Sequence, residues 1–184
     1  MPNTVHLIRH GQSTFNALHD LTGQDPMIND APLSPLGHEQ VAAARLAYAD
    51  VDYDIIFTSP LTRAIQTATG IFGSEAPIHV NLSHSEWVNY SCNTGRPASR
   101  LAAEFTHLDF NHLAEEWWHR GGPVNRHGIE CEPFDSLLQR VSDFRAMIAA
   151  RPEPRIAVVG HGDFFHQVTG RFMNNCERME MRLR

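Results

Sequence analysis

Residues 4–11 read TVHLIRHG and residues 155–162 read RIAVVGHG, and these two stretches carry the clearest structural pattern in the chain. Each begins with a short run of apolar and β-branched side chains, which favours a buried strand. Each run leads at once to a histidine, His10 beside Gly11 in the first and His161 between two glycines in the second. The carboxyl ends of parallel strands meet at one edge of a sheet, so we expect the two histidines to lie close together.

The rest of the chain alternates between expected strands and expected helices. Two helix starts carry serine as the N-cap and proline at the first helical position. The expected strands are 4–8, 53–57, 77–82 and 155–159, with an alternating edge strand at 178–183. Three helices are expected to start at Ser34-Pro35, Ser59-Pro60 and Ser136, and a fourth to run from 163 to about 173. Residues 19–32 are expected to be a loop. This order predicts a single domain over residues 1–184, with a three-layer α/β/α fold, a mostly parallel central sheet and one antiparallel edge strand.

Composition excludes several classes of function. The 184 residues carry a net charge of −6, and all 15 basic residues are arginine. Without lysine the chain is neither a P-loop NTPase nor a Schiff-base enzyme, and its acidic balance argues against a nucleic-acid partner. Three scattered cysteines, Cys92, Cys131 and Cys176, predict free thiols. No stretch has the length of a membrane span and the N-terminus does not resemble a secretory signal, so we expect a cytoplasmic protein without a membrane partner.

Five residues at the predicted strand ends form a chemically coherent set: Arg9, His10, Arg63, Glu86 and His161. Two guanidiniums suit phosphate oxygens, and helix N-termini add backbone donors for an anion. One imidazole can act as a nucleophile, a second imidazole, if protonated, would complete a phosphate pocket, and Glu86 could protonate a leaving group. Two interleaved guanidiniums disfavour a transition-metal site, so we expect neither a metal nor another cofactor.

Each of these residues also has an ordinary structural interpretation. A histidine at a strand end is usually hydrogen-bonded within the fold, and an arginine in a first helical turn is usually a solvated charge. Glu86 could be exposed, in which case Asp163, Glu104 or Glu130 could serve as the acid. Most of the other histidines lack a repeated ligand spacing and are expected on the surface or in the core: His6, His19, His38, His84, His119, His127 and His166.

Four segments, in order and spacing, resemble a known family. They are LIRHGQSTFN (7–16), DAPLSPLG (30–37), SPLTRAIQTA (59–68) and VVGHGDFF (158–165). Together they are similar to the motifs of the histidine phosphatases, also called the phosphoglycerate mutase-like superfamily. Gly160 stands where many members have serine, a departure that leaves the two glycines around His161 intact.

This resemblance implies a phosphoglycerate mutase-like fold and a two-step phosphoryl transfer. His10 would accept the phosphoryl group, and Glu86, matched only by its position after the third strand, would be the acid. The phosphoryl oxygens would be held by Arg9, Arg63 and His161, with lesser contacts from Asn16 and Gly162. The implied enzyme is a histidine acid phosphatase-type, metal-independent phosphomonoester hydrolase that acts on a small phosphorylated metabolite or a phosphoprotein.

Three other functions stay open at this stage, and one of them is a metal-dependent hydrolase, which resistance to EDTA would exclude. A phosphoglycerate mutase must shield its phosphohistidine from water, and residues 84–133, expected as a substrate-side insertion, leave modest room for such a cap. A phosphate-binding protein without turnover would keep the same pocket. The tryptophans Trp87, Trp117 and Trp118 could line a specificity pocket or pack in the core.

Overall fold

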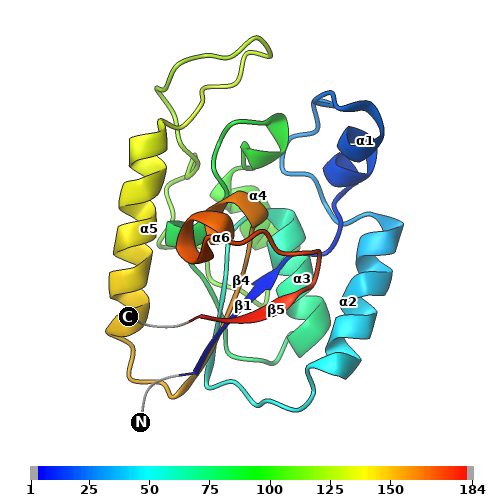
Figure 1. Ribbon diagram of the computed structural model, residues 1–184, viewed down its shortest axis with the longest axis vertical. Helices are drawn as coiled ribbons and strands as arrows, with labels where there is room; N and C mark the ends of the chain where they lie inside the picture. Colours follow the sequence, from blue (N-terminus) through cyan, green and yellow to red (C-terminus); the bar gives the residue numbers. More distant parts are fainter. Residues whose placement is uncertain (1–3, 182–184) are drawn as a thin grey trace.

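A central sheet of five strands organises the computed structural model, which describes residues 4–181 (Figure 1). The strands are β1 (Thr4–Arg9), β2 (Ile55–Thr58), β3 (Ile78–Val80), β4 (Arg155–Gly160) and β5 (Arg178–Met181), in the order β3-β2-β4-β1-β5. All pairs are parallel except β1 with β5, which is antiparallel. The predicted sheet is therefore confirmed. The last two residues of the predicted edge strand, Arg182 and Leu183, lie outside the described residues.

Helices cover both faces of this sheet. The helices of the described residues are α1 (Thr14–Thr22), α2 (Pro35–Ala47), α3 (Thr62–Phe72), α4 (Ala98–Glu104), α5 (Phe134–Ala149) and α6 (Gly162–Thr169). Of these, α5 and α6 cover one face, and α2 and α3 cover the other. Successive side chains of a strand point to opposite faces, so Leu7 packs with α5 and α6 while Ile8 packs with α2 and α3. Figure 1 shows α5 and α2 on opposite sides of the sheet. The predicted three-layer α/β/α fold is confirmed, and no helix within residues 4–181 is long and apolar enough to cross a membrane.

The two Ser-Pro pairs behave differently. Ser34 caps α2 as expected, since its hydroxyl accepts the backbone N–H of Gly37. The prediction that Ser59 starts the next helix is wrong, because α3 begins at Thr62 and its N-cap residue, Leu61, offers no side-chain bond. The Ser59 hydroxyl accepts the N–H of Leu61 at 3.3 Å, before the first helical residue, and lies 2.8 Å from Nε2 of His161.

Three other boundaries differ from the prediction. The expected loop at 19–32 starts late, because α1 continues to Thr22 and ends at Gly23 in the left-handed conformation. The last helix ends at Thr169 rather than near Met173, again before a left-handed glycine, Gly170. The third strand is short, and a 3₁₀ turn at Leu82–His84 replaces its predicted end.

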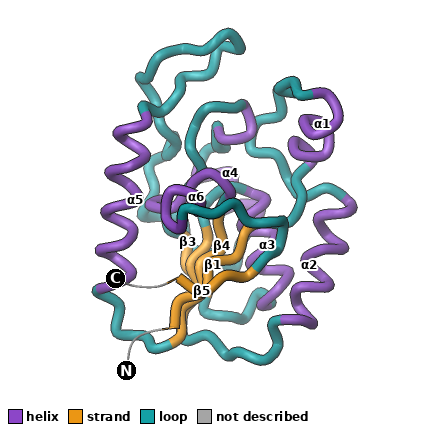
Figure 2. Tube along the Cα trace, in the orientation of Figure 1, coloured by secondary structure: helices purple, strands orange, loops and turns teal. Residues whose placement is uncertain are grey.

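Residues 84–133 contain little regular structure. They comprise a 3₁₀ turn at Ser91–Asn93, the short helix α4 and long connections that Figure 2 shows extending beyond the sheet. Several of their apolar side chains are buried: Leu101, Phe110 and Trp117 pack on Ile65 of α3 in a separate cluster. Trp117 is thus a core residue, as one of the two interpretations expected.

Candidate active site

A cavity of about 150 Å³ lies where β1 and β4 end, beneath the N-terminal parts of α1, α3 and α6. Neighbouring strands carry the two histidines to it, and the His10 backbone N–H donates to the Gly160 carbonyl at 3.0 Å. Six of the predicted site residues line the cavity: Arg9, His10, Asn16, Arg63, Glu86 and Gly162. His161 is completely buried beside it, with its ring centre 5.2 Å from that of His10.

The hydrogen bonds of His10 define its tautomer. Nδ1 lies 2.6 Å from the Gly11 carbonyl oxygen, which can only accept, so Nδ1 carries the proton. Nε2 therefore has a lone pair, and it accepts the Nε–H of Arg63 at 3.2 Å. Burial, followed by the charges of Arg63 and Arg9, holds the pKa of His10 well below its usual value. The imidazole is neutral, with Nε2 available as a nucleophile.

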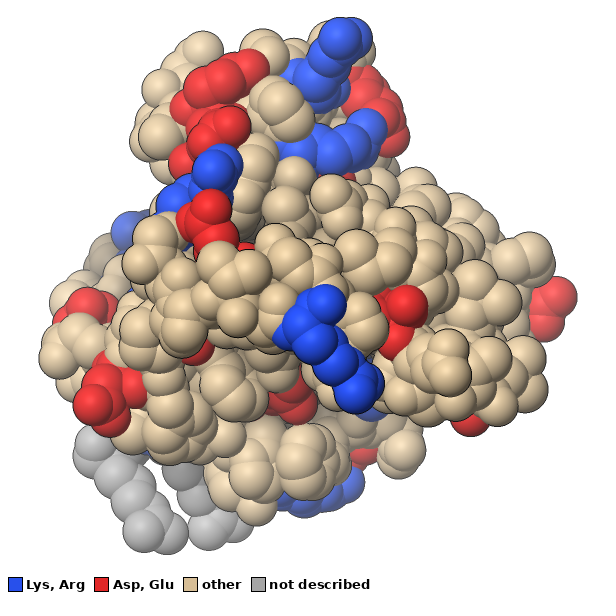
Figure 3. All heavy atoms as spheres, turned by 90° about the horizontal axis from the view of Figure 1, so that it is seen from above, with Lys and Arg blue, Asp and Glu red and all other residues tan. Residues whose placement is uncertain are grey.

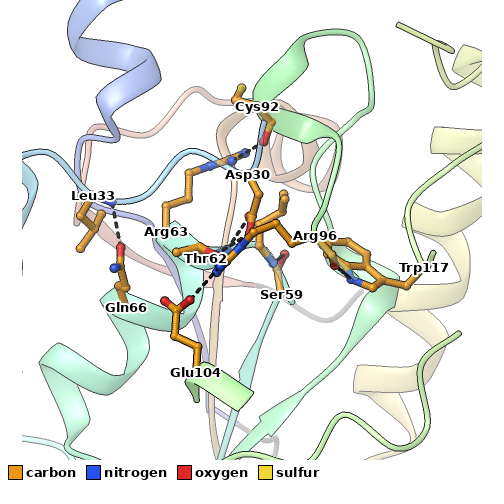
Figure 4. Close-up of polar contacts among 11 residues, drawn as sticks. Asp30, Leu33, Ser59, Thr62, Arg63, Gln66, Cys92, Arg96, Glu104 and Trp117 are labelled. Atoms are coloured by element: carbon orange, nitrogen blue, oxygen red, sulfur yellow. Dashed lines mark hydrogen bonds and ion pairs between the residues drawn. The ribbon is translucent and has the colours of Figure 1, made fainter. Parts of the chain in front are cut away.

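Arg63 is almost fully buried at the first turn of α3. Its Nη1 donates to the Cys92 carbonyl at 2.7 Å (Figure 4). Its Nη2 donates to Oδ1 of Asn93 at 2.9 Å. Within residues 4–181, no carboxylate oxygen lies within ion-pairing distance of this guanidinium. The positive charge is held in place by neutral acceptors, so it is left to interact with an anion in the cavity.

In the described part of the chain, two buried nitrogen atoms of the predicted phosphate-binding residues have no hydrogen-bond partner. Arg9 donates from Nη1 to the Met173 carbonyl at 2.6 Å, but its Nε is buried without an acceptor. Nδ1 of His161 is likewise buried and unpaired. An unpaired buried donor costs free energy, so an anion that satisfied Arg9 would be favoured here. Gly162 lies against Arg9, since a Cβ at this position would stand 3.3 Å from the same Nε.

The protonation of the second imidazole, expected where it completes a phosphate pocket, stays a prediction. Burial and the charge of Arg63 hold the pKa of His161 well below its usual value, which favours the neutral ring. A phosphate dianion beside His161 would favour its protonation.

Glu86 is buried at the N-terminus of α6, where it replaces a side-chain cap. Oε1 accepts the backbone N–H groups of Trp87 and Phe164, both at 2.9 Å, and Oε2 accepts that of Asp163 at 3.1 Å. Burial and then the Asp163 charge raise the pKa of Glu86, against the opposing effect of these donors. A raised pKa suits a group that must hold a proton before it donates one.

Of the competing acids, one lies in the site. Asp163 lines the cavity together with Glu86. Glu104 is paired with Arg96 and Glu130 with Arg120, and neither belongs to the cavity wall. Of the four candidates for the general acid, Glu86 and Asp163 are therefore the two that line the cavity.

The segment that carries Glu86 is held against α5 by Arg140, which is paired with a buried carboxylate. Arg140 of α5 donates to the carbonyl oxygens of Ser83 and Ser85 and forms an ion pair with Glu132 at 2.7 Å. The backbone of Glu132 in turn accepts the indole N–H of Trp87 at 2.8 Å. The chain on both sides of Glu86 is held, which fixes where its carboxyl group lies.

Sequence reasoning missed two parts of the site. The helix α1 places Asn16 in a capping box with Ser13, whose N–H and hydroxyl both donate to Oδ1 of Asn16. A serine three residues before an asparagine is a weaker signal than the usual serine and glutamate, so the helix was not expected. His19, assigned to surface or core, lines the cavity with Tyr90, because α1 folds over the site.

A second cavity of about 190 Å³ adjoins the first. It is lined by Trp117 and Trp118 and shares Glu86 and Asn93 with the cavity around His10. None of the three tryptophans lines the His10 cavity itself. On the face shown in Figure 3, arginine and acidic side chains are interspersed. The positive charge in the cavity therefore comes from Arg9 and Arg63, which line it, and not from a broad basic surface.

The mixed sheet with a ligand-sized cavity at its carboxyl edge is the phosphoglycerate mutase-like α/β/α architecture. The chain belongs to the histidine phosphatase superfamily (branch 1), whose family model matches residues 5–183. The resemblance of the four sequence motifs is thereby confirmed.

Relatives in this superfamily include both phosphatases and mutases. A phosphoglycerate mutase-like protein of Arabidopsis thaliana is 25% identical over 94% of this chain and 76% of its own length. Fructose-2,6-bisphosphatase TIGAR B of Danio rerio is 43% identical, but over 37% of this chain and 25% of its own length. Among solved structures, the alpha-ribazole phosphatase of Shigella flexneri aligns over 95% of this chain and 88% of its own, with 20% identity and a TM-score of 0.64.

Proposed function

We propose that the protein hydrolyses phosphomonoesters through a phosphohistidine formed on Nε2 of His10. The observation that carries the proposal is the His10 tautomer, in which the Gly11 carbonyl holds the proton on Nδ1 and leaves the Nε2 lone pair beside Arg63. The family allows both phosphatase and mutase chemistry. The histidine acid phosphatase type of reaction therefore stays part of this proposal.

The reaction has two steps. In the first, Nε2 of His10 attacks phosphorus, the bond from phosphorus to the alcohol oxygen breaks, and Glu86 gives its proton to that oxygen. In the second, water attacks phosphorus, the N–P bond breaks, and the carboxylate of Glu86 takes the water proton. The products are the alcohol and inorganic phosphate, and His10 and Glu86 return to their starting states.

The positive groups around the cavity stabilise the transferred phosphoryl group. Arg63 reaches Nε2 of His10 and Arg9 has an unpaired buried Nε, so both guanidiniums can donate to phosphoryl oxygens. His161 and Gly162 lie at the start of α6, and Asn16 keeps its side-chain amide nitrogen outside the capping box. Phosphoryl transfer depends mainly on positioning and charge stabilisation, which these residues supply without a metal ion.

The proposal is tested by trapping the covalent intermediate. With ³²P-labelled substrate and an alkaline quench, the wild-type protein should retain an acid-labile phosphoryl group, and His10→Ala should retain none. The exposed histidine of α2 provides the matched control, so His38→Ala should be labelled like the wild type.

Label in the His10→Ala protein would contradict the assignment. Binding of phosphate without any release from p-nitrophenyl phosphate would instead support the non-catalytic alternative. Transfer to a phosphoglycerate at a rate above hydrolysis would support a mutase, and loss of activity in EDTA would point to a metal-dependent hydrolase.

A further inference from the structure

Asp30 is buried outside the cavity, and its contacts join the two segments that hold Arg63 (Figure 4). Its Oδ1 accepts the backbone N–H of Thr62 at 2.8 Å, and its Oδ2 accepts the Thr62 hydroxyl. Oδ2 also accepts Nε–H of Arg96 at 2.8 Å, and the Asp30 N–H donates to the Thr94 carbonyl at 3.0 Å. One carboxylate is thus bonded to α3 and to the segment from 92 to 96.

The bond from Asp30 to Thr62 supplies what α3 lacks. The first N–H groups of a helix need acceptors, and Leu61 at the N-cap has no side-chain acceptor. The nearby Ser59 hydroxyl is already bonded to the Leu61 N–H at 3.3 Å and to Nε2 of His161. The Thr62 N–H therefore takes its acceptor from Asp30. Asp30 reaches the helix from a loop far away in the sequence and caps the turn that carries Arg63.

The bonds to Thr94 and Arg96 act on the other end of Arg63. Its guanidinium donates to Cys92 and Asn93, which lie four and three residues before Arg96. Arg96 also donates from Nη2 to the Thr62 hydroxyl at 2.6 Å. The backbone of Arg63 and the acceptors of its guanidinium are therefore held at a fixed separation through Asp30.

We propose that Asp30 is a positioning residue for Arg63, which sets the guanidinium against Nε2 of His10. The proposal rests on the proposed function, in which Arg63 stabilises the transferred phosphoryl group. Burial raises the pKa of Asp30, so the fold holds a carboxylate where it is costly, and donors from Thr62 and Arg96 offset that cost.

Asp30→Asn is a suitable test because it preserves the backbone. Asp30 has a φ of +43°, a conformation that asparagine tolerates as well as aspartate. The asparagine keeps an oxygen for the Thr62 N–H, but its amide nitrogen takes the place of Oδ2 and cannot accept from the Thr62 hydroxyl or from Arg96. The matched control is Asp54→Asn, since Asp54 also accepts a backbone N–H and a guanidinium, both of Arg155, at the start of β4.

The experiment is a double-mutant cycle on kcat with p-nitrophenyl phosphate. Arg63→Ala should lower kcat by about 10²–10³-fold, the usual loss for one transition-state donor. Asp30→Asn should lower kcat by roughly 10–100-fold in the wild type, as expected for a small displacement of a catalytic group, but by less than about threefold in the Arg63→Ala background. Asp54→Asn should leave kcat unchanged in both backgrounds.

An equal loss from Asp30→Asn in both backgrounds, or none in either, would overturn the proposal. If Asp30→Asn does not fold, Arg96→Met takes its place in the same cycle, because Arg96 is partly exposed and the Asp30 bond to the Thr62 N–H survives. Its loss should be smaller and should again disappear without Arg63, and equal losses in the two backgrounds would count against Asp30.

The same cycle on binding of inorganic phosphate separates this proposal from the proposed function. Asp30→Asn should weaken phosphate binding in the wild type and leave it unchanged in the Arg63→Ala background. That result without any hydrolysis by the wild type would retain the role of Asp30 and reject the phosphatase. Hydrolysis by the wild type, with no coupling between Asp30 and Arg63, would retain the phosphatase and reject the role of Asp30.

Discussion

Burial acts in opposite directions on the two groups that exchange protons and phosphate in the proposed reaction. It lowers the pKa of His10, a base, and raises the pKa of Glu86, an acid, because each loses the solvation of its charged form. Each shift therefore favours the neutral form of its group. A neutral imidazole can attack phosphorus and a neutral carboxyl can donate a proton, so burial, together with the neighbouring charges, prepares both partners.

These shifts predict the pH profile. We expect kcat/KM to rise as the pH passes the lowered pKa of His10 and that group loses its proton, and to fall as the pH passes the raised pKa of Glu86. Glu86→Gln should remove most of the fall at higher pH. It should also slow hydrolysis of alkyl phosphates much more than that of p-nitrophenyl phosphate, whose leaving group needs little protonation. The fall at higher pH is checked by kcat/KM profiles of the wild type and Glu86→Gln on the same substrate, because titration of the substrate then affects both proteins equally.

Two results would assign Glu86 differently. Equal losses on both substrates would indicate a positional role at the start of α6. Full activity on both would transfer the acid role to Asp163, the other carboxyl group that lines the cavity.

Helix α5 fixes the position of Glu86, the proposed acid, which lies against the start of α6. Arg140 joins α5 to the carbonyls of Ser83 and Ser85, and Glu132, whose side chain is 2% exposed, neutralises it. The removal of one partner from a buried pair leaves an uncompensated charge, which usually costs about 3–5 kcal/mol. Arg140→Met should therefore lower the free energy of unfolding by about that amount, as measured by urea denaturation.

Loss of the Arg140 contacts should also affect catalysis, and the effect should depend on the leaving group of the substrate. Below the unfolding temperature, Arg140→Met should reduce turnover of alkyl phosphates more than that of p-nitrophenyl phosphate, since Glu86 is displaced. Glu132→Leu combined with Arg140→Met should recover much of the stability but not the activity on alkyl phosphates. Recovery of both would show that the pair serves stability alone.

For the whole molecule, buried neutral histidines predict sensitivity to acid. His84 is fully buried, its Nε2 lies 3.2 Å from the Val159 carbonyl oxygen, and burial lowers its pKa to about 3. An unfolded chain takes up the proton near pH 6.5, so the stability due to His84 is complete above that pH and is lost as the pH falls towards 3. The difference of the two pKa values corresponds to roughly 4–5 kcal/mol.

Thermal unfolding between pH 7 and 4 measures this effect. The unfolding temperature should fall steadily as the pH is lowered, and His84→Gln should show a shallower fall from a lower starting value. Glutamine can still donate to Val159 but does not titrate in this range. Identical pH slopes for the two proteins would show that other groups govern acid unfolding.

Local patterns were sufficient for much of the architecture and for the residues of the candidate site. The apolar runs at β1 and β4 and the cap at Ser34 depend on neighbours within a few residues, and the structure agrees with them. The order of strands and helices then places the residues after β1 and β4 at one edge. The placement of Arg9, His10 and Arg63 in one cavity follows from that topology.

Contacts between distant segments determined the rest. The sequence alone indicates that Ser59-Pro60 starts a helix, but the hydroxyl of Ser59 bonds His161, 102 residues away, and Asp30 caps α3 instead. The pKa directions of His10 and Glu86 depend on how much water the folded chain removes. A local pattern states which residues can form an element, whereas burial and the choice among hydrogen-bond partners exist only once the segments are packed together.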